Sequence, residues 1–96
     1  MSGNTYGLQD KVVVVTGGSR GIGLAIAAQL LREKAKVVIC ARKKEGLDQA
    51  VKDLGEQEAL MAIQAHIARE DEVEILFNSV QERFARCDVL INNVGM

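Results

Sequence analysis

Short apolar runs alternate along the chain with stretches whose apolar residues recur every three or four positions. The runs predict β-strands at residues 12–15, 36–40, 60–63 and 88–91. The intervening stretches predict helices at residues 22–34 and 43–54, with Gly55 as the stop of the second, and a third helix whose apolar stripe runs from Val73 to Phe84. This alternation is typical of βαβ units around a parallel sheet. Right-handed crossovers would place the first two helices on one face of the sheet and the third on the other.

The third predicted helix shows the clearest periodicity. One apolar stripe along it is made of Val73, Leu76, Phe77, Val80 and Phe84. Ile75 falls on the opposite face, which the stripe does not explain. Ala68 and Arg69 come just before this helix, where a hydroxyl or a short acid would make a better N-cap. We therefore predict a helix that packs through its stripe and begins without a side-chain cap.

Composition narrows the function classes. Twelve basic residues against thirteen acidic ones give a net charge of -1, which argues against a broad nucleic-acid or anionic-lipid footprint. The apolar runs are too short to span a bilayer, and the first nine residues carry no readable signal peptide. Cys40 and Cys87 lack metal-ligand spacing, so we expect two reduced, buried thiols, no metal site and a cytoplasmic location.

A glycine-rich segment, TGGSRGIG at residues 16–23, joins the first strand to the first helix. Gly17 permits a tight turn with positive φ, Gly21 lets a pyrophosphate approach the backbone, and Gly23 lets the helix pack closely on the strand. The N–H groups of the helix start would face the phosphates. The spacing G-x-x-x-G-x-G is not Walker A, because Leu24 stands where a lysine is needed. An ordinary strand–helix turn is the alternative interpretation.

Two segments in register resemble the short-chain dehydrogenase/reductase family: TGGSRGIG after VVVV, and DVLINNVG at residues 88–95. The second is similar to the family's N-N-A-G segment, with Val94 where alanine is usual. The resemblance covers nearly the whole chain from Leu8 onward. It implies an α/β, Rossmann-like three-layer fold with a parallel sheet of order 3-2-1-4. We expect residues 1–10 to be a lead-in, and residues 11–96 to form an NADP-binding Rossmann half-domain that is truncated after the fourth strand.

The residues after the second strand favour NADP over NAD. No acid precedes Glu45, and a carboxylate is what usually holds the ribose hydroxyls of NAD. Arg42 could instead grip a 2′-phosphate with its guanidinium, and Arg20 could approach the same phosphate. The family resemblance implies basic residues at these two places in NADP-preferring members. For Lys43 and Lys44 we favour a solvated first helical turn, so NADP(H) is the expected cofactor and NAD is less favoured.

The adenine end departs from the family pattern. The resemblance implies an aspartate after the third strand that accepts a bond from the adenine amine, and His66 stands there. A neutral imidazole has one acceptor nitrogen, so the contact can form but is weaker than with a carboxylate. A loop histidine that only packs is the alternative. The predicted cofactor-contacting residues are Gly17, Ser19, Arg20, Gly21, Ile22, Gly23, Arg42, His66, Ile67, Asn93 and Gly95.

The resemblance implies hydride transfer between NADP(H) and a carbonyl or alcohol, by a tyrosine and lysine spaced Y-x-x-x-K, a serine and an asparagine. None of these maps onto this sequence: Tyr6 is the only tyrosine, and Asp10 follows four residues later. We therefore expect a cofactor-binding half that is inactive alone. The alternatives are a stand-alone nucleotide-binding or interaction module and an inert fragment. An open edge at residues 89–91 also predicts self-association.

Overall fold

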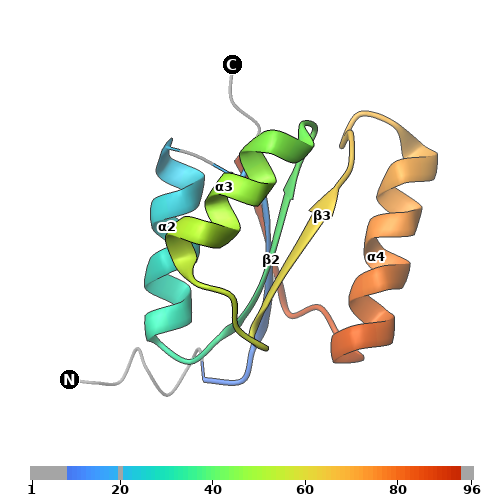
Figure 1. Cartoon of the computed structure of the whole chain (residues 1–96). Helices are drawn as coiled ribbons and strands as arrows, with labels where there is room; N and C mark the ends of the chain where they lie inside the picture. Colours follow the sequence, from blue (N-terminus) through green and yellow to red (C-terminus); the bar gives the residue numbers. More distant parts are fainter. Residues whose placement is uncertain (1–8, 20, 94–96) are drawn as a thin grey trace.

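The computed structural model describes residues 9–19 and 21–93, in which strands and helices alternate (Figure 1). The elements are β1 (Val12–Thr16), α2 (Gly21–Arg32), β2 (Lys36–Ala41), α3 (Lys44–Leu54), β3 (Leu60–Gln64), α4 (Glu70–Phe84) and β4 (Val89–Asn92). The strands form one sheet in the order β3-β2-β1-β4, and each pair is parallel. The predicted α/β class and strand order are confirmed.

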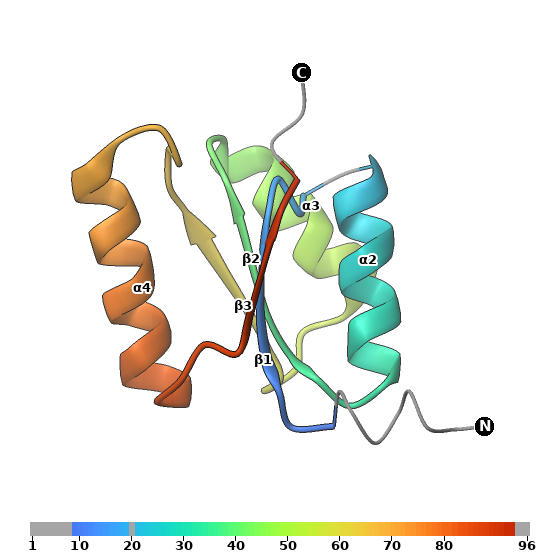
Figure 2. The same ribbon diagram turned by 180° about the vertical axis from the view of Figure 1, so that it is seen from behind.

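The helices cover both faces of the sheet (Figures 1 and 2). Val13, Val15 and Ile39 pack with residues of α2 and α3 in one apolar cluster. The alternate residues Val14 and Cys40 pack with residues of α4 in a second cluster. The strands β1 and β2 therefore read as continuous apolar runs, because each buries both of its faces. The predicted division of the helices, two on one face and one on the other, is confirmed.

The α4 helix packs as its periodicity predicts. Leu76 and Val80 of the stripe are fully buried, while Ile75 on the opposite face is 60% exposed. The N-cap residue, Arg69, makes no side-chain capping hydrogen bond, as expected from the sequence. Three acidic residues in the first turn, beginning with Glu70, instead complement the positive end of the helix dipole.

The end of α2 differs from its prediction. The helix ends at Arg32, two residues before the expected end at residue 34. Lys34 has a left-handed φ of 69°, and the Ala35 N–H donates to the Leu30 carbonyl at 3.1 Å. The Lys34 N–H donates to the Leu31 carbonyl, also at 3.1 Å. This is a Schellman motif, which usually contains glycine at the left-handed position. Because lysine occupies that position here, the sequence contains no glycine to mark the end of the helix.

The loop before β4 corrects one expectation about the cysteines. Both are free, and Cys40 is buried in β2, but Cys87 is exposed. The prediction that Cys87 is buried was wrong, because this residue precedes the first residue of β4, Val89. Asp88 then joins β4 to β1, since its N–H donates to the Val12 carbonyl and its carboxylate accepts from the Val12 N–H, both at 2.9 Å.

The strand β4 forms one edge of the sheet. Val89 is 40% exposed and Leu90 is 51% exposed, although both are apolar. The expected open apolar edge is therefore present over residues 89–91, while self-association through it stays a prediction. Over residues 9–19 and 21–93, each helix is too short or too polar to cross a membrane.

Candidate functional site

The carboxyl ends of β1, β2 and β3 lie at one edge of the sheet, together with the first turn of α2 (Figure 1). In parallel α/β sheets this edge is where ligands bind. The β1–α2 loop, Arg42 after β2 and His66 after β3 follow one another along it. The predicted contacts Arg20 and Gly95 lie outside the described residues.

Two of the loop glycines serve close backbone packing. Gly17 has a φ of +66°, and a Cβ there would lie 2.3 Å from the Asn93 carbonyl oxygen. A Cβ on Gly23 would lie 2.3 Å from the Gly17 carbonyl oxygen and 2.7 Å from the Asn93 Nδ2 atom. The N–H groups of Gly17 and Gly18 donate to the Cys40 carbonyl at 2.8 and 3.3 Å. These contacts fix the loop against β2 and the end of β4.

Gly21 differs from these glycines. It has a φ of +61°, yet a Cβ there would meet no described atom within 4 Å. Beside it, the Ile22 side chain is 73% exposed, and the first turn of α2 contains no acidic residue. The first N–H groups of a helix have no helical partner and carry partial positive charge. The loop therefore offers open backbone and a helix N-terminus to an anionic group.

Thr16 links the end of β1 to β4, a role that the sequence analysis missed. The side chain is buried, with an exposed fraction of 1% for the residue. Its hydroxyl accepts from the Asn93 N–H at 2.9 Å and donates to the Asn92 Oδ1 atom at 3.0 Å. The sequence feature that could have indicated this role is a polar residue directly after four buried valines, since a buried hydroxyl needs a hydrogen-bond partner. Thr16 thereby holds Asn93 against the two packed glycines, Gly17 and Gly23.

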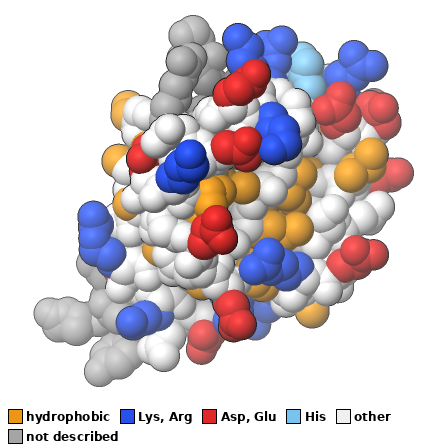
Figure 3. Space-filling model, in the orientation of Figure 1, with side chains coloured by type: hydrophobic (Ala, Val, Ile, Leu, Met, Phe, Trp, Pro, Cys, Tyr) orange, Lys and Arg blue, Asp and Glu red, His pale blue; other side chains and the backbone are white. Residues whose placement is uncertain are grey.

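Arg42 follows β2 and has an exposed side chain. The Gln64 side-chain amide donates to the Arg42 carbonyl at 3.0 Å, which joins the ends of β2 and β3. Lys44 pairs with Asp48 at 3.1 Å, whereas no carboxylate of the described residues pairs with the Arg42 guanidinium. Figure 3 shows Lys and Arg side chains gathered along this upper edge of the molecule. Arg42 therefore presents a cation without a local counter-ion in the described part of the chain.

The turn between β3 and α4 is held by a small polar network around His66. The His66 N–H donates to the Glu72 Oε1 atom at 2.6 Å, and the Ala68 N–H donates to the His66 Nδ1 atom at 3.3 Å. The Arg69 Nε atom lies 3.3 Å from the other oxygen of Glu72. Ile67 is half-buried and packs on the α4 side of the core. Glu72 braces this turn, a role that no local sequence pattern indicates.

Cys40 contributes to the site through its backbone only. Its carbonyl accepts the two loop N–H groups described above, and its Sγ atom lies 3.7 Å from the Ala65 carbonyl oxygen. Burial, and then the Glu72 carboxylate, raise the pKa of the Cys40 thiol above its usual value. A buried thiol with a raised pKa is a poor nucleophile. Within the described ranges no group of three His, Cys, Asp or Glu residues could hold a metal ion.

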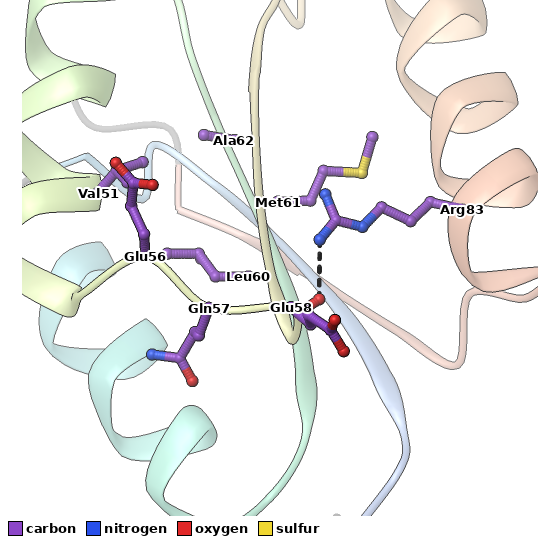
Figure 4. A pocket seen from close by; sticks show the side chains of 8 residues that line it. All are labelled: Val51, Glu56, Gln57, Glu58, Leu60, Met61, Ala62 and Arg83. Carbon is purple, nitrogen blue, oxygen red and sulfur yellow. Dashed lines mark hydrogen bonds between the residues drawn. The ribbon is translucent and has the colours of Figure 1, made fainter.

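A separate open hollow of about 620 Å³ lies along the free edge of β3 (Figure 4). Its lining is Val51, Glu56, Gln57, Glu58, Leu60, Met61, Ala62 and Arg83. The Arg83 guanidinium donates to the Glu58 carbonyl at 2.8 Å, so α4 is tied to the start of β3. Most of this lining comes from the α3–β3 loop and the first residues of β3, with Val51 from α3 and Arg83 from α4, and none of the predicted cofactor-contacting residues belongs to it.

Comparison with known proteins identifies the family. A family model described as short chain dehydrogenase matches residues 11–96. The chain belongs to this family. An uncharacterized oxidoreductase of Mycobacterium bovis is 36% identical over 89 residues, which cover 93% of this chain. That match covers 36% of the relative, so this chain spans little more than a third of the length of the curated relatives it matches.

Two solved structures share the fold of this chain. A short chain dehydrogenase from Bacillus anthracis superposes with a TM-score of 0.84 at 35% identity, covering 88% of this chain and 35% of that one. A structure of actinorhodin polyketide ketoreductase with NADPH superposes with a TM-score of 0.83 at 39% identity, covering 91% of this chain and 34% of that one. The family's cofactors are NAD(P), so the carboxyl edge described above is the place to examine for dinucleotide binding.

Proposed function

We propose that this chain binds NADP(H) along the carboxyl edge of its sheet, with residues 11–96 acting as the cofactor-binding half of a short-chain dehydrogenase/reductase. The whole protein would transfer hydride between NADP(H) and a carbonyl or alcohol. The observation that carries the proposal is the open backbone at Gly21 on the first turn of α2, with Arg42 following the neighbouring strand β2.

The phosphate end is assigned to the β1–α2 loop. The Gly17 and Gly18 N–H groups already donate to Cys40, so the pyrophosphate falls to the backbone from Ser19 to Gly23 and to the α2 dipole. Anion binding there is favoured because the first turn contains no carboxylate. Thr16 and Asn93 act indirectly, by keeping the glycine loop and the end of β4 together.

The preference for NADP(H) is assigned to Arg42. A guanidinium can form two parallel charge-assisted hydrogen bonds with a phosphate group, and the Arg42 side chain is exposed at the end of β2. The residues after it, Lys43 and Lys44, add positive charge rather than an acid. The structurally similar ketoreductase, whose structure is with NADPH, supports the same choice.

The chemistry in such an enzyme is divided between two parts. The nicotinamide supplies or takes the hydride, and a positioned acid–base group must move the proton. The Y-x-x-x-K pair that the family resemblance implies is absent from this sequence, where Tyr6 is the only tyrosine. The proposed role of these 96 residues is therefore to bind and orient the cofactor, and the reaction is assigned to the whole protein.

Calorimetric titration with NADP+ and NAD+ tests the proposal. A charge-assisted contact of about 1.5–3 kcal/mol predicts that NADP+ binds roughly 10- to 150-fold more tightly. Arg42→Asp should erase or reverse this preference, because a carboxylate repels the 2′-phosphate. Lys34→Asp is the matched control, since it makes the same charge change at an exposed residue whose φ of 69° aspartate tolerates. Equal binding of the two dinucleotides by the unmodified chain would contradict the assignment of Arg42.

A further inference from the structure

If the dinucleotide binds as proposed, the order of the strand ends directs its adenine base to the turn between β3 and α4. On the proposed function, on which this inference rests, the phosphates lie at the start of α2, after β1. The ribose phosphate lies at Arg42, after β2. Because β3 is the next strand outward, the base continues toward the residues that follow β3. The first polar side chain there is His66, which is half-buried.

The imidazole of His66 has already used its acceptor nitrogen. The Ala68 N–H donates to Nδ1 at 3.3 Å, and a neutral imidazole has one acceptor and one donor nitrogen. The remaining nitrogen, Nε2, therefore carries the proton and can only donate. On this inference His66 donates to the base instead of accepting a bond from the adenine amine, because the acceptor nitrogen is occupied within the turn.

The backbone of the turn keeps the ring in this role. The His66 N–H is held by the Glu72 carboxylate at 2.6 Å, and the His66 carbonyl accepts from the Arg69 N–H at 3.0 Å. An aspartate at this position could accept the Ala68 N–H with one oxygen and still offer the other to an amine. An imidazole cannot do both, so histidine changes the polarity of the contact.

We propose that His66 is a specificity-determining residue that presents a hydrogen-bond donor to position 6 of the purine. A 6-oxopurine offers an acceptor oxygen at that position, whereas adenine offers an amino group, which is a donor. The site should therefore favour the hypoxanthine dinucleotide over the adenine dinucleotide, relative to the same site with a carboxylate. The selectivity arises because the less favoured purine leaves its group at position 6 facing a group of the same kind, donor to donor or acceptor to acceptor, without a hydrogen bond.

Two substitutions of His66 test whether the base meets a hydrogen-bond donor or an acceptor. Each new side chain can still accept the Ala68 N–H that holds the turn. In His66→Asn, the amide oxygen can accept the Ala68 N–H and the amide NH2 remains a donor. In His66→Asp, one carboxylate oxygen caps the turn and the other is an acceptor. Circular dichroism and thermal melting of both variants check that the fold is kept, so a change in selectivity is not mistaken for unfolding.

The experiment is a calorimetric titration with NADP+ and with nicotinamide hypoxanthine dinucleotide phosphate, both in the same buffer. The measured quantity is the ratio of the two dissociation constants. The ratio should be similar in the unmodified chain and in His66→Asn, and should shift about 2- to 12-fold toward NADP+ in His66→Asp. An unchanged ratio in His66→Asp, with both dinucleotides bound, overturns the inference about His66. If neither dinucleotide binds the unmodified chain, the proposed function itself fails.

Discussion

Replacing Gly23 with alanine would test how the phosphate loop is assembled. A Cβ at this position would lie 2.3 Å from the Gly17 carbonyl oxygen and 2.7 Å from the Asn93 Nδ2 atom. The nearer atom is backbone, so it can move only if the loop moves with it. Overpacking of this kind costs about 1–3 kcal/mol. The higher helix propensity of alanine returns about 0.5–1 kcal/mol of that. We expect a net loss in the free energy of unfolding of up to about 2.5 kcal/mol, with a midpoint of about 1 kcal/mol.

Gly46 is a matched control, because it is the third residue of α3 as Gly23 is the third residue of α2. A Cβ on Gly46 would approach the Ser19 Oγ atom at 3.3 Å and the Ser19 Cβ atom at 3.5 Å. The hydroxyl of Ser19 can rotate away. Gly46→Ala should therefore be neutral or stabilising by up to about 1 kcal/mol.

Urea unfolding followed by circular dichroism at 222 nm measures both variants. The two changes are chemically identical and should shift the unfolding midpoint in opposite directions, or shift it only in Gly23→Ala. Gly23→Ala should also weaken NADP+ binding, because the displaced loop carries the proposed phosphate contacts. If Gly23→Ala is as stable as the unmodified chain, the close packing of α2 on the loop does not control its geometry.

Three further predictions concern stability, association and turnover. The hydrogen bond from the Arg86 side chain, and then the one from the Val12 N–H, hold the pKa of Asp88 below its ordinary value. The Asp88 contribution to stability is then present above about pH 4 and is lost as pH falls through the folded pKa. The difference in unfolding free energy between the unmodified chain and Asp88→Asn should accordingly shrink in acid; a constant difference would refute this. The open edge of β4 should cause self-association in sedimentation velocity. Leu90→Lys should reduce it because an edge lysine blocks strand pairing, whereas Ile75→Lys, at a similarly exposed residue of α4, should not; a compact monomer at high concentration would count against the idea. The purified 96-residue chain should not consume NADPH with reactive ketones, aldehydes or quinones, and turnover clearly above the buffer rate would show that proton transfer has been misjudged.

Much of the fold was predictable because strong periodic signals agree with one another. The four valines of β1 and the stripe of α4 each follow from burial on one or two faces. The strand order needed the family resemblance, since periodicity does not say which strands are neighbours. The end of α2 was missed because lysine, rather than glycine, occupies the left-handed position of its Schellman motif.

The candidate site was predictable in its glycines and less so in its polar contacts. Sequence spacing indicated the roles of Gly17 and Gly21, because positive φ and open backbone are properties of glycine itself. Thr16 was missed because its hydroxyl meets Asn93 across 77 residues of sequence. The hydrogen bond that the His66 Nδ1 atom accepts from the Ala68 N–H depends on the path of the turn after β3. Such contacts depend on tertiary geometry, which local patterns do not contain.

Amide chemical-shift mapping by NMR would show where NADP(H) binds on this chain, and thus whether it binds at the carboxyl ends of the strands. The isotope-labelled chain would be titrated with NADP+ while each backbone N–H is followed. If NADP+ binds at the carboxyl ends of the strands, the largest shifts are expected at residues 21–23, at Arg42 and at the turn containing His66. Shifts confined to the hollow lined by Glu56, Met61 and Arg83, or no shifts at saturating NADP+, would contradict it.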